Sequence, residues 1–190
     1  AVLQTDSLKN IFVGSSNLSG EPEPVATTVT IFPLKAPNRL IRKRYWDAPD
    51  QFIYSEAEYV KFFPHDEYKD ESDYHNWPRA NSIYSTADTS NRKFQIANTK
   101  LTPGWYAIEA TAKDKDGNNI KAVEYVQLYD AAAKTIPLPL YNWHTDIKTN
   151  VQPGETAGFI TGSAARDIFL IQQTDKHIEE KARPLNDAEV

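Results

Sequence analysis

Apolar and polar residues alternate with a period of two over much of the chain. In residues 23–34, one face of the pattern carries four mostly β-branched side chains: Val25, Thr27, Val29 and Ile31. A period of two sends successive side chains to opposite faces of a sheet, whereas a helix repeats every 3.6 residues. The pattern therefore predicts a fold built mainly from β-strands.

The clearest local prediction is a β-hairpin. Residues 105–114 and 119–130 both alternate, and Asp116-Gly117 lies between them. Glycine at this position supplies the positive φ that a tight hairpin turn needs. Pro103 and Gly104 indicate a turn that leads into the first of the two strands.

Shorter segments complete the predicted set of strands. Residues 9–17 and 92–100 each suit a short strand bounded by turn residues. Several such strands favour an all-β fold, an antiparallel β-sandwich of the macroglobulin or fibronectin-III type. A partly helical insertion, at about 46–90, interrupts this sandwich.

One helix is predicted inside the insertion. Ser55 and Glu58 have the spacing of a capping box, and Pro64 ends the helical pattern. Aromatic side chains share one face of it: Tyr59, Phe62 and Phe63. About eight residues make too short a helix to be stable alone, so it is expected to dock on the sandwich.

A domain boundary is predicted after the hairpin. Residues 1–131 form the first β-sandwich domain with its insertion, and residues 132–190 form a linker, stiffened by Pro137 and Pro139, and part of a second β-sandwich domain. Strands are expected in 151–164 and 166–175, with a third around 141–147. The polar tail, 176–190, is expected to be a frayed helix or an extended end.

Composition narrows the function classes. The 190 residues have a net charge of −5, which argues against nucleic acid as a partner because phosphate binding needs a basic surface. There is no cysteine, so thiol catalysis, thiolate metal sites and disulfides are excluded. No apolar run is long enough to insert in a membrane, and the first ten residues do not have the pattern of a signal peptide.

Charge is unevenly distributed. Five basic residues fall in 35–44, and nine carboxylates but only two lysines fall in 47–73. Opposite charges this close in the chain are expected to pair with one another on the surface.

The densest acidic stretch, 63–77, admits three interpretations. Its carboxylates and histidines are of a type that binds metal: His65, Asp66, Glu67, Asp70, Glu71 and His75. Their spacing matches no metal motif, and no spacing identifies a pair of catalytic carboxylates. The alternative is structural, since ten aromatic residues would give the insertion a small core of its own: Trp46, Phe52, Tyr54, Tyr59, Phe62, Phe63, Tyr68, Tyr74, Trp77 and Tyr84.

No other motif indicates catalysis or a cofactor. If Gly117 took the sixth position of an EF-hand loop, Ala112 and Val123 would occupy two ligand positions, which excludes calcium binding there. None of the four histidines lies in a sequence context that identifies a catalytic triad. The chain is therefore expected to be non-enzymatic, with no cofactor and no metal.

Several stretches together resemble the alpha-2-macroglobulin-like family. Three are similar to strands and turns of macroglobulin-type β-sandwich domains: SGEPEPVATTVTIFPL, LTPGWYAIEATAKDKDGNNIKAVEYVQLYD and VQPGETAGFITGSAARDIFLIQQTD. The stretch between them resembles an insertion found in large Bacteroidetes-type members: YWDAPDQF with SEAEYVKFFPHDEYKDESDYHNW. The resemblance covers most of the chain.

This resemblance implies a secreted, cell-surface or periplasmic protein that inhibits proteases by trapping them. Family members that trap covalently use a Cys-Gly-Glu-Gln thioester, and this chain has no cysteine to supply it. The aromatic insertion is also unlike a flexible bait segment. The implied role is a structural segment whose partners are neighbouring domains of a larger chain and the trapped protease.

Candidate interaction residues follow from two hypotheses. As a scaffold, the chain would use Tyr141 and Trp143 at an inter-domain contact, unless they belong to the core of the second unit. As a carbohydrate- or protein-binding module, it would expose Trp46, Trp77 and Trp105 on one surface. Burial of all three would remove the second hypothesis.

Overall fold

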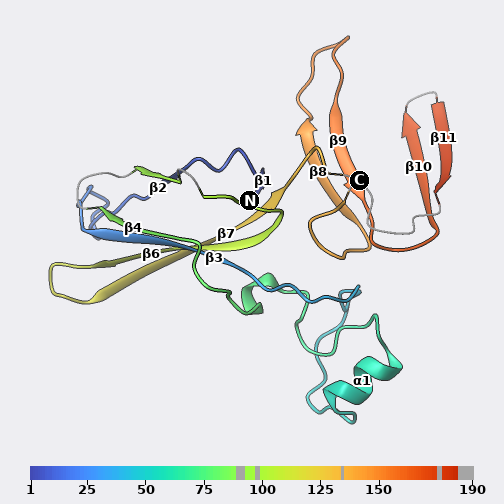
Figure 1. The fold of residues 1–190 in the computed structure, drawn as a ribbon, viewed down its shortest axis with the longest axis horizontal. Coiled ribbons are helices and arrows are strands. Elements are labelled where there is room, and N and C mark those ends of the chain that lie inside the picture. The colour runs from blue at the N-terminus through green and yellow to red at the C-terminus, as the bar shows by residue number, and fades with distance from the viewer. Residues whose placement is uncertain (89–92, 97–98, 134, 175–176, 184–190) are drawn as a thin grey trace. The chain divides into compact units, whose positions relative to one another are not determined.

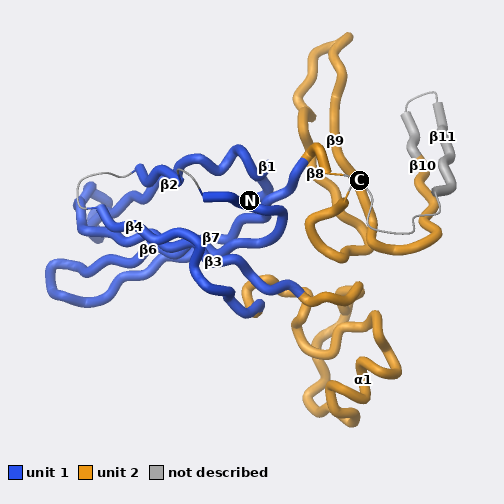
Figure 2. Tube along the Cα trace, in the orientation of Figure 1, with its two compact units in different colours: residues 1–36, 77–130 blue, residues 37–76, 131–190 orange. Residues whose placement is uncertain are grey.

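A computed structural model describes residues 1–88, 93–96, 99–133, 135–174 and 177–183. The chain divides into two compact units, residues 1–36 with 77–130 and residues 37–76 with 131–190 (Figure 2). Apart from one short α-helix and a single 3-10 turn, the described elements are β-strands. The predicted all-β class is confirmed at this level.

Unit 1 is organised around a five-stranded sheet (Figure 1). Its order is β1 (Val2–Gln4), β7 (Asn119–Tyr129), β6 (Gly104–Lys113), β3 (Thr27–Pro33) and β4 (Tyr84–Asp88). All neighbours are antiparallel except β1, which runs parallel to β7. The sheet is therefore mixed, whereas the sequence predicted only antiparallel pairing.

The β6–β7 hairpin confirms the strongest local prediction. Asp114 begins the turn, and its carboxylate accepts hydrogen bonds from the backbone amides of Asp116 and Asn118 at 2.9 and 2.8 Å. Gly117 has φ of 85°, which a residue with a Cβ adopts only under strain. The turn thus fixes the register in which Lys113 opposes Asn119.

The core of unit 1 lies on one face of this sheet. Alternate residues of β3, Thr27, Val29 and Ile31, are buried, as their period of two predicts. The core cluster draws on four segments: Ile31, Ile96, Tyr106, Val126 and Leu128. Strands β2 (Asn10–Phe12) and β5 (Lys93–Gln95) form a separate antiparallel pair, from which Ile11 packs against the cluster.

Residues 37–76 leave unit 1 and return to it at adjacent points. The Lys35 amide donates to the Pro78 carbonyl at 2.8 Å, and the Ala80 amide donates to the Pro33 carbonyl at 2.8 Å. Arg79 is further tied to Glu109 of β6 at 2.5 Å. We call residues 37–76 the excursion and this paired exit and return its neck. The sequence placed strand β4 inside the insertion. In the structure β4 follows the neck along the chain and belongs to the five-stranded sheet.

Unit 2 combines the excursion with the C-terminal strands. The excursion holds α1 (Glu56–Phe62) and a 3-10 turn (Tyr74–Asn76). Two antiparallel pairs follow, β8 (Trp143–Lys148) with β9 (Gly158–Gly162), and β10 (Ile168–Thr174) with β11 (His177–Arg183).

The tail decides between two alternatives. Its first part is extended, as strand β11, and not a frayed helix, and it pairs with β10 along seven residues, a pairing that the sequence did not predict. Pairing gives the backbone N–H and C=O groups of β10 their partners, a benefit that does not depend on apolar side chains. Residues 184–190 lie outside the described part of the chain.

Candidate functional site

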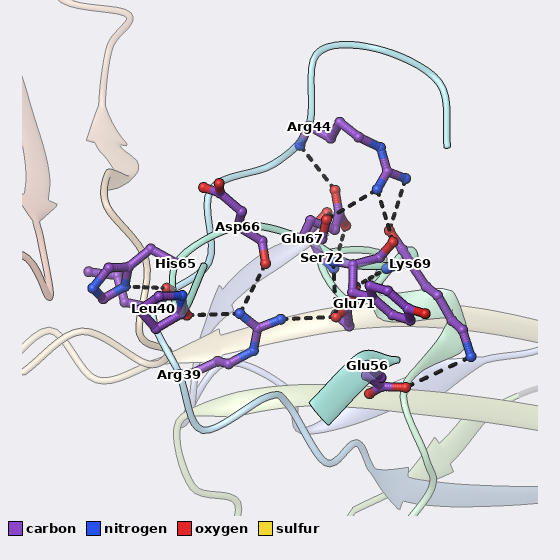
Figure 3. Close-up of polar contacts among 12 residues, drawn as sticks. Arg39, Leu40, Arg44, Glu56, His65, Asp66, Glu67, Lys69, Glu71 and Ser72 are labelled. Carbon is purple, nitrogen blue, oxygen red and sulfur yellow. Dashed lines mark hydrogen bonds and ion pairs between the residues drawn. The ribbon is translucent and has the colours of Figure 1, made fainter. Parts of the chain in front are cut away.

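The excursion carries the acidic and aromatic stretch, and arginine side chains hold its backbone in place (Figure 3). Arg39 donates from Nη1 to the carbonyls of Pro64 and Asp66 at 2.8 and 3.1 Å, and from Nη2 to Glu71 at 2.9 Å. One planar guanidinium therefore fixes three points on the returning chain, which suits its fork of donors.

Arg44 makes the most extensive set of contacts. Its Nη1 donates to the carbonyls of Glu67 and Tyr68 at 3.2 Å each, and its Nη2 donates to the Lys69 carbonyl at 3.0 Å. Its Nε donates to the Trp46 carbonyl at 3.1 Å, and Asp70 lies 3.6 Å from Nη2. Only 9% of the side chain is exposed. Arg44 thus donates to carbonyls that backbone amides would satisfy in a β-strand or a helix.

Glu67 is the buried carboxylate of the excursion, with 6% exposure. Its Oε1 accepts from the amide and hydroxyl of Ser72 at 2.9 and 2.5 Å, and its Oε2 accepts from the Arg44 amide at 3.0 Å. Burial by itself would raise the pKa of Glu67, but these hydrogen bonds and the Arg44 charge together lower the pKa below its ordinary value. The carboxylate is therefore held ionised as a structural acceptor.

The remaining acids are engaged in similar ways. Glu71 accepts from the amides of Tyr68 and Lys69 at 3.2 and 2.6 Å as well as from Arg39. Arg42 and Asp66 form an exposed ion pair at 2.6 Å, and the hydrogen bond that Arg42 donates to the Asp66 carboxylate raises the pKa of Arg42. The basic and acidic blocks do pair with one another, as expected, but two of the three arginines act from partly buried positions.

A small aromatic cluster forms around Tyr68, which is buried. Its ring centroid lies 4.4 Å from that of Phe52 and 5.2 Å from that of Tyr59, and its hydroxyl donates to the Tyr54 carbonyl at 2.8 Å. The single ten-residue core suggested by the sequence does not form. Trp77 and Tyr84 belong to unit 1, and Trp46 is 72% exposed.

Large apolar side chains of the excursion face solvent. Tyr45 and Ile53 are 99% and 93% exposed, and Trp46 and Phe62 are also exposed. Exposed apolar groups gathered in one segment mark an interaction surface more often than scattered ones do. The alternation and motif patterns gave no signal for Tyr45 or Ile53, because exposure depends on where the chain turns.

The five predicted interaction residues occupy different environments. Trp46 is exposed on the excursion, whereas Trp77 and Trp105 pack edge to face within unit 1, with ring centroids 6.5 Å apart. Tyr141 is partly exposed, and its ring lies 6.3 Å from that of His65. Trp143 is 4% exposed on β8, the environment expected if it belongs to the core of its own unit.

The six residues considered as metal ligands do not converge. His65 lies against the Leu40 carbonyl at 3.0 Å, and His75 against Asp73 at 2.6 Å. Within the described ranges, no three His, Cys, Asp or Glu side chains gather where they could hold a metal ion. The helix in this part of the chain is too short and too polar to cross a bilayer.

The excursion also contains a cavity of about 400 Å³. Its lining comes from both ends of the excursion, with Trp46 and Asp47 on one side and Asp70, Asp73 and Tyr74 on the other. Hydrogen bonds from the His75 amide and ring, and the nearby charge of Lys43, lower the pKa of Asp73. The sequence alone does not reveal this cavity, because its lining comes from two segments, 43–48 and 67–76, that are far apart in the chain.

No protein-family model, curated protein or solved structure matches this chain.

Proposed function

We propose that the chain is a non-catalytic structural and interaction segment of an alpha-2-macroglobulin-like protein that contributes to protease inhibition by trapping. In this proposal, unit 1 is built on a macroglobulin or fibronectin-III-like β-sandwich, and residues 132–190 belong to a second such domain. The protein acts at the cell surface, in the periplasm or outside the cell.

One observation carries the non-catalytic role. The carboxylates that could have served chemistry, Glu67 and Glu71 above all, accept hydrogen bonds from arginines and backbone amides of the excursion itself. A carboxylate with its lone pairs occupied in this way stabilises a conformation and is poorly placed to accept a proton from a substrate. The excursion is then a rigid body that presents Tyr45, Trp46 and Ile53 outward.

The second candidate is an extracellular carbohydrate- or protein-binding module. Trp46 favours it, because an exposed indole beside a cavity with polar walls can stack on a ligand. Trp77 and Trp105 do not provide a pair of open ring faces for such stacking, because they pack on each other.

Protease capture by the parent protein tests the first candidate. A protease held in a steric trap keeps its activity on a small peptide substrate and loses it on a large protein substrate. We expect this pattern for the parent protein, and we expect the double variant Tyr45→Ser/Trp46→Ser to weaken it. Equal loss of both activities, or of neither, contradicts trapping; oligosaccharide binding lost on Trp46→Ser would favour the second candidate.

A further inference from the structure

The cavity of the excursion is lined in part by polar and charged residues to which the function proposed above assigns no role, Asp47 and Asp73 among them. Trp46, Asp47, Asp70, Asp73, Tyr74 and Asn76 line it together with residues of the arginine network. Its volume of about 400 Å³ lies within the range of small-ligand sites in proteins. It can accommodate one side chain or a small organic molecule.

The charge of the lining is negative. Four carboxylates, from Asp47, Glu67, Asp70 and Asp73, are set against two cations, from Lys43 and Arg44. Arg44 is already committed to four backbone carbonyls and lies close to Asp70. Lys43 is the second cation, and its charge acts on Asp73. An anion entering the cavity would therefore still meet more carboxylates than cations.

The aromatic residues of the lining select among cations. Trp46, which is 72% exposed, and Tyr74, whose ring lies against that of His75 with centroids 4.1 Å apart, both line the cavity. The face of an aromatic ring carries partial negative charge and attracts ammonium and guanidinium groups. A metal ion would need several converging oxygen ligands, and the described side chains do not provide them. An organic cation needs only one carboxylate partner and an apolar wall.

We propose that this cavity binds an organic cation, a guanidinium or an alkylammonium group, between Trp46 and the carboxylates of Asp47 and Asp73. The group is carried either by an arginine or lysine side chain of a partner polypeptide or by a free amine. The inference stands on the cavity alone and does not require that the protein trap proteases.

Calorimetric titration of the chain with matched ligands tests this. N-acetyl-argininamide and N-acetyl-lysinamide are compared with N-acetyl-citrullinamide, which has nearly the shape of the arginine ligand but no charge. We expect both cations to bind at least tenfold more tightly than the citrulline ligand, and to bind more weakly as salt is raised. Equal affinity for arginine and citrulline ligands, or preference for a neutral oligosaccharide, overturns the proposal.

Two variants locate the binding. Trp46→Leu is expected to weaken arginine binding about threefold to tenfold by removing the ring face, and Asp47→Asn about threefold. Both side chains are exposed, so the fold is expected to survive, and circular dichroism checks it. Asp50→Asn is the control, because Asp50 is exposed on the same excursion but does not line the cavity. Equal effects of Asp47→Asn and Asp50→Asn, or no effect of Trp46→Leu, would overturn the site.

The source of the cation is decided by two further ligands. A tripeptide with central arginine that binds at least tenfold more tightly than the amide indicates a partner polypeptide, and tighter binding of spermidine indicates a free amine. Either result supports the cation site. Protease capture with intact Asp47→Asn parent protein separates the two proposals, since it can persist when arginine binding is lost.

Discussion

At the scale of residues, Arg44 does most to define the excursion. Its guanidinium reaches the carbonyls of Trp46, Glu67, Tyr68 and Lys69, which come from both ends of a segment with little regular structure. Buried carbonyls without partners are costly, so a single side chain that satisfies four of them holds the path of the chain.

Arg44→Lys should therefore loosen the excursion while keeping the charge. A lysine ammonium donates from one point and cannot span these acceptors. We expect a loss of about 1–3 kcal/mol in local stability, seen as faster amide exchange in residues 66–72. Arg42→Lys is the matched control: its pair with Asp66 is exposed and should contribute little to local stability. Equal exchange in the two variants would contradict the role of Arg44.

Glu67 should make the excursion sensitive to acid. The pKa of Glu67 is lower in the folded protein than in an unfolded chain, so its contribution to stability is present above the unfolded pKa and is lost as pH falls through the folded pKa. We expect urea unfolding to show a smaller stability difference between pH 7 and pH 3.5 in Glu67→Gln than in the wild type. Glu21→Gln, an exposed control, should keep the wild-type difference.

The sequence predicted these contacts only as two blocks of opposite charge. It could not assign Arg39 to Glu71 or Arg44 to Glu67, because the partners are 23 to 32 residues apart and the connecting backbone has no period. Nor could it separate buried Trp143 from exposed Trp46, since each has a tyrosine within two residues and polar residues around it.

At the scale of elements, α1 has a start that its sequence encodes directly. The Ser55 amide and hydroxyl donate to Glu58 at 2.9 and 2.6 Å, and the Glu58 amide donates back to the Ser55 hydroxyl oxygen at 3.4 Å. The capping box is thus confirmed, as is the end of the helix just before Pro64. Both features are local, which is why spacing alone revealed them.

Ser55→Ala should destabilise α1 by about 1 kcal/mol, because it removes the side chain that caps the Glu58 amide. Amide exchange in residues 58–62 is the measurement, and about fivefold faster exchange is expected. Ser55→Asp keeps an acceptor at the cap and should restore most of the protection. Unchanged exchange in Ser55→Ala would mean that packing of Tyr59 alone holds the helix.

Pairing between distant strands was harder to predict than individual strands. The β6–β7 hairpin followed from two alternating runs and an Asp-Gly turn. The parallel pairing of β1 with β7 joins residues more than 120 positions apart, and three residues of β1 are too few to carry a periodic signal. Strand β11 is equally hidden, because its charged sequence suits several conformations.

At the scale of the whole molecule, the chain leaves and re-enters unit 1 at the neck, where the exit and the return are hydrogen-bonded to each other. Replacing residues 37–76 by Asn-Gly should leave unit 1 folded, because Lys35 and Pro78 are already hydrogen-bonded and a shorter loop costs less entropy to close. We expect amide protection in β3, β6 and β7 to stay within about threefold of the wild type. Loss of protection along β3 would show that the sheet depends on the excursion.

The commitment of Arg44 to backbone carbonyls has a consequence for digestion. Trypsin-like enzymes need an arginine that can extend fully into a deep specificity pocket. The Arg44 guanidinium cannot enter that pocket while it is hydrogen-bonded to carbonyls of its own chain. An intact molecule should therefore survive exposure to such an enzyme at this peptide bond. Cleavage after Arg44 would therefore show that the segment had unfolded locally before the enzyme cut it.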